Sequence, residues 1–463
     1  MERLHLRRLP PREGEIRIMV LKIEEKKPLF RRRRPQDNPY RVVVLAFLIL
    51  GGMLLLRAYD ARAIQPLFMP TPTPTRAANS YALEAETQFL AGNLGAAIEA
   101  YQKAAQIDPQ NARLYAELAR IQTYSSSLLT TDAERKTRLQ EALQNINKAA
   151  ELNPDDTLVH AIRAFVLDWN ANPVLAGEEA PRLLVEAEQA ALRALQLDSQ
   201  NALALAYYAE VLVDQQKWGQ AEEYIQIALQ RDPSLMDVHR VSGYVQESLS
   251  NYEGAIQEYL QAIKITPNFT PLYIAIGANL RQLKRYDEAL EYFAKAVEIN
   301  QRLGVKDPIP YLSIAKTYSQ KGEFFAAALN VRAALEMIPD NPDVYGQLGM
   351  VYFKSRNYES AIPALKCAVR GCSAEESCEV RRCNPETDRP MAIQGLPLSD
   401  STVVYYYTYG AALAGMHRPS NNYCAEAMQV LAEVRQAYAQ DAVVMGIVEP
   451  SERICESFGY TRP

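Results

Sequence analysis

The stretch NYEGAIQEYLQAIKITP, residues 251–267, is answered 34 residues later by RYDEALEYFAKAVEIN, residues 285–300. Aromatic and small residues return at the same places in both segments. The matched pairs are Tyr252 and Tyr286, Ala255 and Ala289, Tyr259 and Phe293, and Ala262 and Ala296. A spacing of this size indicates a supersecondary unit that recurs along the chain.

The same unit can be followed from Ala78 to Ala368, through eight copies. Its second helix carries two alanines seven residues apart around a central residue, which is large in all but one copy. The alanine pairs are Ala97 and Ala104, Ala142 and Ala149, Ala187 and Ala194, Ala221 and Ala228, Ala255 and Ala262, Ala289 and Ala296, Ala327 and Ala334, and Ala361 and Ala368. Their recurrence predicts one closely packed helix face in every copy.

The first helix of most copies has a large residue followed four positions later by a small one, as in Tyr273 and Gly277. Residues four apart share a helix face, so the small residue lets a neighbouring helix approach. Prolines at 109, 154, 233, 267 and 339 end the second helices. Because neither helix can bury its face alone, successive pairs must stack.

This pattern resembles the tetratricopeptide repeat family, whose unit is a 34-residue helix-turn-helix. The resemblance covers residues 78–372 and implies an all-α fold: a right-handed α-solenoid with a concave groove lined by first helices. The spacing grows to 45 in units two and three, which predicts an 11-residue insertion in each, between its first and second helices. The phase slips by four near residues 304–307. An irregular ninth unit within 401–463, with Tyr406 and Gly410 in its first helix, is expected to cap the solenoid.

The N-terminal segment predicts a membrane anchor. Residues 1–41 hold 13 Lys and Arg against 6 Asp and Glu, and an uncharged apolar run lies between Arg41 and Arg57. We expect a basic cytoplasmic leader over 1–39, one transmembrane helix over 40–59 and a Pro/Thr-rich spacer over 60–77, with everything beyond outside the cytoplasm. A signal peptide cleaved after Ala63 is the alternative, and a buried core helix is a weaker one.

The remaining chain is acidic: since residues 1–41 carry +7 and the whole chain −5, the rest carries −12. That charge disfavours nucleic acid as a partner. All six cysteines lie in the last hundred residues, which suits an oxidising compartment. We expect Cys424 to pair with Cys455 in the C-terminal cap. Within a loop at 373–400 and just before it, Cys367, Cys372, Cys378 and Cys383 are expected to form two bridges of their own, with zinc as the disfavoured alternative.

No residue pattern indicates catalysis, a metal or a cofactor. His160 and His239 occupy the slot that holds Tyr in most first helices, so both are interpreted as structural. The resemblance implies a non-catalytic scaffold, of the membrane-anchored extracytoplasmic bacterial type, that binds a protein or peptide segment in its groove and contacts the lipid bilayer through residues 40–59. The alternative is an accessory subunit that recruits a cell-envelope or polysaccharide-synthesis enzyme.

The resemblance also implies which residues face the groove. They lie one, five and eight places after the large-residue slot of the first helix. In units five to eight these places include Arg240, Tyr244, Glu247, Arg281, Lys316, Met350 and Phe353. Arg and Tyr are frequent anchors of binding surfaces, and the last two residues would add an apolar patch.

Overall fold

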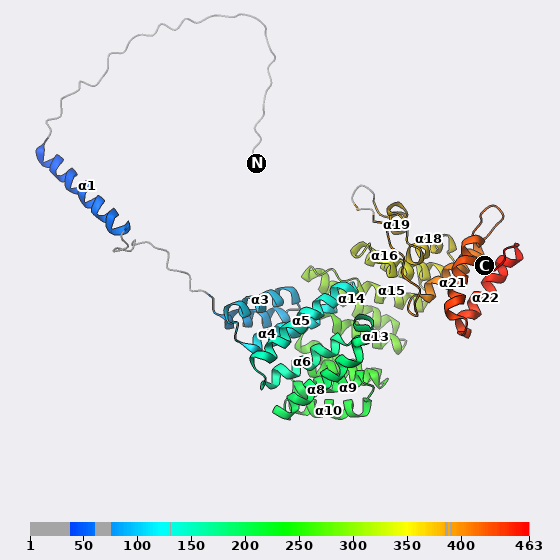
Figure 1. The fold of residues 1–463 in the computed structure, drawn as a ribbon, viewed down its shortest axis with the longest axis horizontal. Helices are drawn as coiled ribbons and strands as arrows, with labels where there is room; N and C mark the ends of the chain where they lie inside the picture. The colour runs from blue at the N-terminus through cyan, green and yellow to red at the C-terminus, as the bar shows by residue number, and fades with distance from the viewer. Residues whose placement is uncertain (1–37, 61–75, 130, 385–387, 389–390, 463) are drawn as a thin grey trace, which may run out of the picture. The chain divides into compact units, whose positions relative to one another are not determined.

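The structure is a computed structural model that describes residues 38–60, 76–129, 131–384, 388 and 391–462. The chain divides into two compact units, residues 1–75 and 76–463, and each is treated by itself. Regular structure in the described residues is helical, apart from two isolated bridges between single residue pairs (Figure 1).

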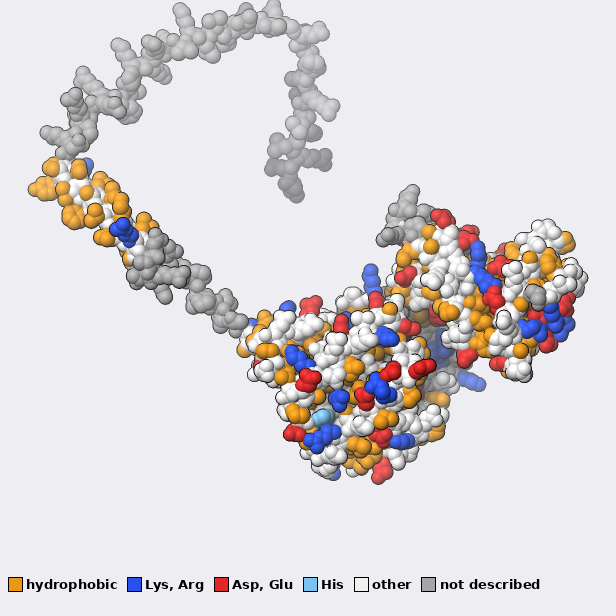
Figure 2. Space-filling model, in the orientation of Figure 1, with side chains coloured by type: hydrophobic (Ala, Val, Ile, Leu, Met, Phe, Trp, Pro, Cys, Tyr) orange, Lys and Arg blue, Asp and Glu red, His pale blue; other side chains and the backbone are white. Residues whose placement is uncertain are grey.

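The first unit contains helix α1 (Pro39–Asp60). Its segment 39–58 is long and apolar enough to cross a membrane, with a mean hydropathy of 2.1 and no burial against other residues. Hydrophobic side chains cover its visible surface in Figure 2. Length and composition alone are weak evidence for a span, because a signal sequence passes the same test. The leader up to residue 37, the cleavage site near Ala63 and most of the spacer lie outside the described residues.

The second unit is a series of antiparallel helix pairs, each packed within itself and against the next. The first four pairs are α2 (Ala78–Leu90) with α3 (Leu94–Ile107), α4 (Ala112–Ser126) with α5 (Asp132–Leu152), α6 (Thr157–Asn170) with α8 (Ala180–Leu197), and α9 (Ala202–Asp214) with α10 (Trp218–Arg231). The next four are α11 (Met236–Ser248) with α12 (Tyr252–Ile265), α13 (Thr270–Gln282) with α14 (Tyr286–Leu303), α15 (Ile309–Lys321) with α16 (Phe324–Met337), and α17 (Pro342–Lys354) with α18 (Tyr358–Val369).

The packing inside each pair follows the small and large positions of the sequence. All sixteen alanines of the second-helix pattern are fully buried, at 0% exposure. Opposite them, a Cβ built on Gly277 of α13 would lie 2.5 Å from the ring of Phe293 on α14. Gly243 stands in the same relation to Tyr259, at 2.6 Å. Glycine at these places therefore lets an aromatic ring lie directly against the helix backbone.

Helix ends also follow the sequence. The five second helices α3, α5, α10, α12 and α16 each end two residues before their proline. The phase slip is absorbed by α14, which has 18 residues where α12 has 14, and it ends at Gly304 in the left-handed region with φ +69°. Glycine adopts this conformation without the strain that a Cβ would bring.

The two insertions take different forms. In unit two the additional residues mainly lengthen the second helix, since α5 has 21 residues and begins with a capping box between Thr131 and Glu134. In unit three they form a separate segment between α6 and α8, made of the short helix α7 (Pro173–Ala176) and a 3₁₀ turn over Gly177–Glu179. Only the second insertion comes to line the cavity described below.

The solenoid turns back on itself, so that the first repeats meet the fifth and sixth. A Cβ on Gly92 would clash with the carbonyl oxygen of Asn268. The ring of Phe269 lies 6.2 Å from Phe89 of α2 and 5.2 Å from Tyr124 of α4. Segments about 145 to 180 residues apart in sequence are thus in contact, which local periodicity does not predict.

The C-terminal part ends the stack. The expected loop over 373–400 contains a helix, α19 (Ala374–Arg381), begun by a capping box of Ser373 and Glu376. It is followed by the irregular ninth pair, α20 (Val403–Met416) with α21 (Cys424–Tyr438), and by α22 (Ala442–Ser457), which packs on both.

The six cysteines form three pairs at disulfide distance. These are Cys367 with Cys372, Cys378 with Cys383, and Cys424 with Cys455. The last pair joins α21 to α22 with a Cα–Cα distance of 5.4 Å, and both residues are fully buried. The pairing clamps the end of the solenoid, where fraying would otherwise be easiest.

Candidate functional site

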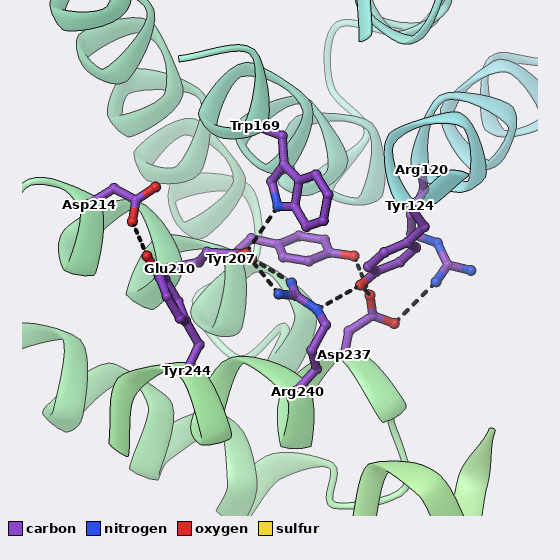
Figure 3. A network of polar contacts seen from close by, with 9 residues as sticks. All are labelled: Arg120, Tyr124, Trp169, Tyr207, Glu210, Asp214, Asp237, Arg240 and Tyr244. Carbon is purple, nitrogen blue, oxygen red and sulfur yellow. Dashed lines mark hydrogen bonds and ion pairs between the residues drawn. The ribbon is translucent and has the colours of Figure 1, made fainter. Parts of the chain in front are cut away.

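Three first helices, α4, α9 and α11, converge on a buried polar cluster, which we call the central network (Figure 3). Some of its hydrogen bonds join α4 to α11, across 113 to 117 residues of sequence. Others join the neighbouring repeats that contain α9 and α11. The central network comprises Arg120, Tyr124, Tyr207, Glu210, Asp237 and Arg240.

Asp237 is the acceptor on one side of the central network. Its carboxylate accepts hydrogen bonds from the hydroxyls of Tyr124 and Tyr207, the latter at 2.6 Å, and from Arg120 at 3.1 Å. Burial by itself would raise the pKa of Asp237, but the guanidinium charges of Arg120 and Arg240 and the two hydroxyl donors hold it below the ordinary value. Asp237 is therefore an ionised, fully partnered carboxylate.

Arg240 links the Asp237 side of the central network to Glu210. Its Nε donates to the Tyr124 hydroxyl at 3.0 Å, while Nη1 and Nη2 donate to the two oxygens of Glu210 at 2.8 and 2.5 Å. Glu210 also accepts from the Trp169 indole Nε1 at 3.1 Å. With 9% exposure and every guanidinium nitrogen bonded, Arg240 differs from the free groove anchor that the sequence suggested. Because the solenoid turns back on itself, helices of earlier repeats pack over Arg240 and bury it.

Beside the central network lies a cavity of about 860 Å³. First helices α6, α9, α11 and α13 supply half of its lining residues, and the unit-three insertion closes one side with Pro173 and Gly177. Apolar and aromatic side chains predominate, among them Trp169, Leu184 and Phe269. This size and lining are typical of a ligand-binding pocket.

Three carboxylates and the hydroxyl of Tyr244 line the cavity together with the guanidinium of Arg240. The Tyr244 hydroxyl donates to Asp214 at 2.5 Å. Desolvation and then the charge of Glu210 raise the pKa of Asp214 to about 6, although the bond from Tyr244 opposes the shift. Asp168 is 3% exposed, and its Oδ1 atom has no hydrogen-bond partner among the described residues. Burial, followed by the charges of Asp214 and Glu210, raises the pKa of Asp168 well above its ordinary value.

The other groove residues suggested by the sequence lie on successive first helices, outside this cavity. Glu247 accepts from Tyr259 at 3.2 Å and from Asn279 at 3.0 Å. Arg281 donates to the Ser313 carbonyl at 3.4 Å, and Lys316 on the next first helix is exposed. Desolvation, then the positive charges of Arg281 and Lys354, lower the pKa of Lys316. The face thus changes sign, from acidic at the cavity to basic along α13–α17.

Met350 and Phe353 on α17 are half-buried and pack against the C-terminal hydrophobic cluster. The Phe353 ring lies 5.3 Å from that of Tyr358. Part of each side chain remains accessible, so the two residues border the groove face without forming a wholly open patch.

The two histidines in the tyrosine slot have structural partners. His160 Nε2 bonds the Pro154 carbonyl at 2.8 Å, and His239 Nε2 bonds the Pro233 carbonyl at 2.9 Å. Tyr273 uses its hydroxyl in the same way on the Pro267 carbonyl at 2.7 Å. A polar tip in this slot therefore ties the first helix to the turn before it, which agrees with the interpretation from sequence.

Sequence reasoning missed Asp168, Glu210 and Asp214. The signal was available: eight places after His160 stands Asp168, and five places after Leu205, which holds the slot of unit four, stands Glu210. The groove prediction covers only units five to eight. Asp214 falls one place beyond the pattern, and only the structure brings it to the cavity.

Comparisons with known proteins agree with the helix-pair architecture. Sequence models described as tetratricopeptide or TPR repeats match residues 87–122, 185–235, 209–268, 271–303 and 342–370. The chain also matches the BBSome complex member BBS4 of Bos taurus, with 24% identity over 117 residues. That match spans 25% of this chain and 22% of the relative.

Among solved structures, the human IFIT1 dimer with PPP-AAAA superposes with a TM-score of 0.50 at 16% identity, covering 82% of this chain and 91% of that one. TTC0263, a thermophilic TPR protein from Thermus thermophilus, gives a TM-score of 0.36 at 16% identity, covering 44% of this chain and 99% of that one. The IFIT1 similarity extends to the fold alone.

Proposed function

Because the chain carries tetratricopeptide repeats, which generally mediate protein–protein interactions, we propose that it is a non-catalytic scaffold binding a protein segment along its first helices. The observation that supports this proposal most directly is the cavity of about 860 Å³ between first helices α6, α9, α11 and α13. Its lining is mostly apolar, which suits a partner side chain removed from water. The change from acidic to basic side chains along the face would orient such a segment.

The charges of the groove favour a polypeptide over a phosphorylated ligand. The IFIT1 structure contains PPP-AAAA, whose phosphates need cations. In this chain Arg240 is the one cation among the described residues that line the cavity, and it is bonded to Glu210 on both guanidinium ends. Three carboxylates at the same cavity would repel a triphosphate.

We further propose that residues 40–59 anchor the scaffold in a membrane, with the repeats outside the cytoplasm. The support is α1, the excess of basic residues before it, and six cysteines placed as three pairs. Protease added to intact cells or spheroplasts should remove residues 76–463, and peptide mapping should find Cys424 linked to Cys455. A protected C-terminal tag together with six free thiols would overturn this placement.

The binding function is tested by filling the cavity. Ala275 of α13 is a lining residue, and its replacement by Trp would occupy the cavity without removing a charge. The full-length wild-type chain in detergent should retain a stoichiometric partner from its native cells after cross-linking, and A275W should lose it. The control is Q226W, which introduces the same side chain at an exposed position of α10. Equal retention by A275W and Q226W would exclude this groove as the binding site.

The identity of the retained partner also distinguishes a general scaffold from an accessory subunit of an enzyme assembly. A stoichiometric enzyme would make the chain the accessory subunit of an enzyme assembly, whereas a non-enzymatic partner would leave it a scaffold in the general sense. Tetratricopeptide repeats are typically non-catalytic, so in both cases the chemistry would belong to the partner.

A further inference from the structure

The buried charges of the central network balance one another. Two guanidinium groups, Arg120 and Arg240, face two carboxylates, Asp237 and Glu210, and each carboxylate bonds directly to one guanidinium. Arg120 also bonds Glu117 at the rim, at 2.8 Å. The nitrogens of both guanidinium groups therefore donate to other partners, and neither group bonds Asp168 or Asp214.

Two carboxylates remain on the cavity wall. Asp214 accepts only the neutral hydroxyl of Tyr244 among the bonds that the structure records for it. Asp168 is almost wholly buried, and its Oδ1 has no partner within the described part of the chain. An unsatisfied buried carboxylate is costly, and two carboxylates at one cavity repel each other. Burial and the charges of neighbouring acids raise the pKa values of Asp168 and Asp214, although the positive charge of Arg240 opposes both shifts.

The geometry around these acids favours an organic cation over a metal ion. Over the residues that the structure describes, no three carboxylate, imidazole or thiol groups lie close enough together to hold a metal ion. The walls next to the acids are apolar or aromatic, with Trp169, Tyr244 and Leu184 among them. Such walls suit the methylene stem of a long cation, and aromatic rings also attract its charged head.

We propose that this cavity binds an ammonium or guanidinium group on an apolar stem, with Asp168 and Asp214 as its counter-ions. In the scaffold function proposed above, on which this assignment rests, the group is the side chain of a lysine or arginine in the bound segment. The bound cation would satisfy the open Oδ1 of Asp168 and neutralise the repulsion between the two acids.

Trp169 provides a direct reading of occupancy. The chain has two tryptophans, and the other, Trp218 of α10, is 47% exposed and absent from the cavity lining. In the full-length W218F chain in detergent, fluorescence would report on Trp169 alone. The probe is the capped peptide Ala-Ala-Arg-Ala-Ala, and its control replaces arginine by citrulline, which has the same shape without the charge.

We expect the arginine peptide to change the fluorescence saturably and the citrulline peptide to bind at least tenfold more weakly. The variant D168N/D214N, which keeps the side-chain shapes, should lower the affinity for the arginine peptide at least tenfold while its helical melting stays cooperative. The matched control is E222Q/E223Q, which removes two exposed charges from α10 and should leave the affinity unchanged. Equal binding of the two peptides, or equal binding by D168N/D214N and the control, would overturn the proposal.

A second probe, n-butylguanidinium, distinguishes a free small-molecule cation from a partner's side chain. It has the stem and charged head of arginine without the peptide. Tighter binding of the peptide assigns the cation to a partner side chain, whereas equal or tighter binding of n-butylguanidinium keeps the cation site and assigns it to a small molecule. Loss of partner capture in A275W without any charge preference would retain the scaffold function and refute the cation site. Unchanged partner capture in A275W, together with tighter binding of the arginine peptide than of the citrulline peptide, would retain the cation site and refute the scaffold function of this groove.

Discussion

Arg240 shows how a single residue can hold a groove position and still be unavailable to a ligand. It stands where the repeat pattern places a binding residue, on the inner face of α11. There it bonds Glu210 of the preceding repeat and Tyr124 of the second repeat, so its charge is compensated inside the protein. Its substitution should therefore affect folding before it affects binding.

We predict that R240M destabilises the chain by about 3–5 kcal/mol, because it leaves the carboxylate of Glu210 buried without its counter-charge. The double variant R240M/E210M should recover most of that loss, since both charges are then absent. The free energy of unfolding in urea measures the effect. Arg182 and Glu179, with side chains 59% and 63% exposed, form the control pair, and R182M should cost less than about 1 kcal/mol. Similar losses in R240M and R182M would contradict the interpretation.

Asp307, between α14 and α15, makes stability depend on pH. It is 1% exposed, and desolvation raises its pKa to about 6, although bonds from the Ile309 amide and the Asn300 side chain oppose the shift. The folded pKa lies above the unfolded value of 3.8, so the protonated form is favoured by folding. This contribution is complete below about pH 4 and is lost as the pH rises through about 6.

D307N stays neutral at every pH and should lack this dependence. We expect the stability of the wild type relative to D307N to fall by up to about 3 kcal/mol between pH 4 and pH 7. Urea titrations at several pH values measure the difference. D155N, at a carboxylate whose side chain is 73% exposed, is the control and should follow the wild type within a few tenths of a kcal/mol. A constant difference across the range would show that Asp307 does not titrate there.

At the scale of the helix, the contact of a glycine with an aromatic ring decides how closely a pair packs. In an open helix position, alanine in place of glycine gains up to about 1 kcal/mol of helix propensity. At Gly277 the new methyl group would meet the Phe293 ring at 2.5 Å, which is closer than real contacts allow. The steric cost should exceed the propensity gain.

We therefore predict that G277A lowers the free energy of unfolding by about 1–3 kcal/mol. Its counterpart is G446A in α22, where nothing lies within 4 Å of the new Cβ, so that the change should be neutral or stabilising. Circular dichroism with denaturant titration compares the two. If G277A gains stability as G446A does, the ring must be able to move, and the close approach would not determine the packing of the pair.

At the scale of the second unit, the return of the solenoid onto its first repeat joins residues that no repeat places together. Phe269 is 2% exposed and inserts its ring between α2 and α4. The end repeat of a solenoid normally has one neighbour only and frays first. Here the first repeat has a second neighbour, the turn before α13.

We predict that F269A destabilises the chain by about 3–5 kcal/mol and increases amide hydrogen exchange most strongly in α2 and α3. Hydrogen exchange followed by mass spectrometry resolves the helices, and α15–α18 should keep their protection. F325A, at a phenylalanine that is 78% exposed on α16, is the control and should change neither quantity appreciably. A uniform loss of protection in F269A would mean that the contact does not hold the first repeat specifically.

The sequence by itself determined the helix pairs, their order and the faces that they bury. Those features depend on residues four, seven and 34 apart, which share a face or a unit whatever the rest of the chain does. It also indicated which positions look inward, and Asp168 and Glu210 satisfy that pattern once it is extended to units three and four.

Only the tertiary structure decided what the inward positions do. Small rotations between successive pairs accumulate until α4 meets α11, and no local pattern specifies their sum. That closure brings Arg120 and Tyr124 against Asp237 and Arg240. Both guanidinium groups are then bonded to partners inside the protein. Asp168 and Asp214 lie at the cavity without a directly bonded cation, because charge compensation depends on distances in space and not on spacing along the chain.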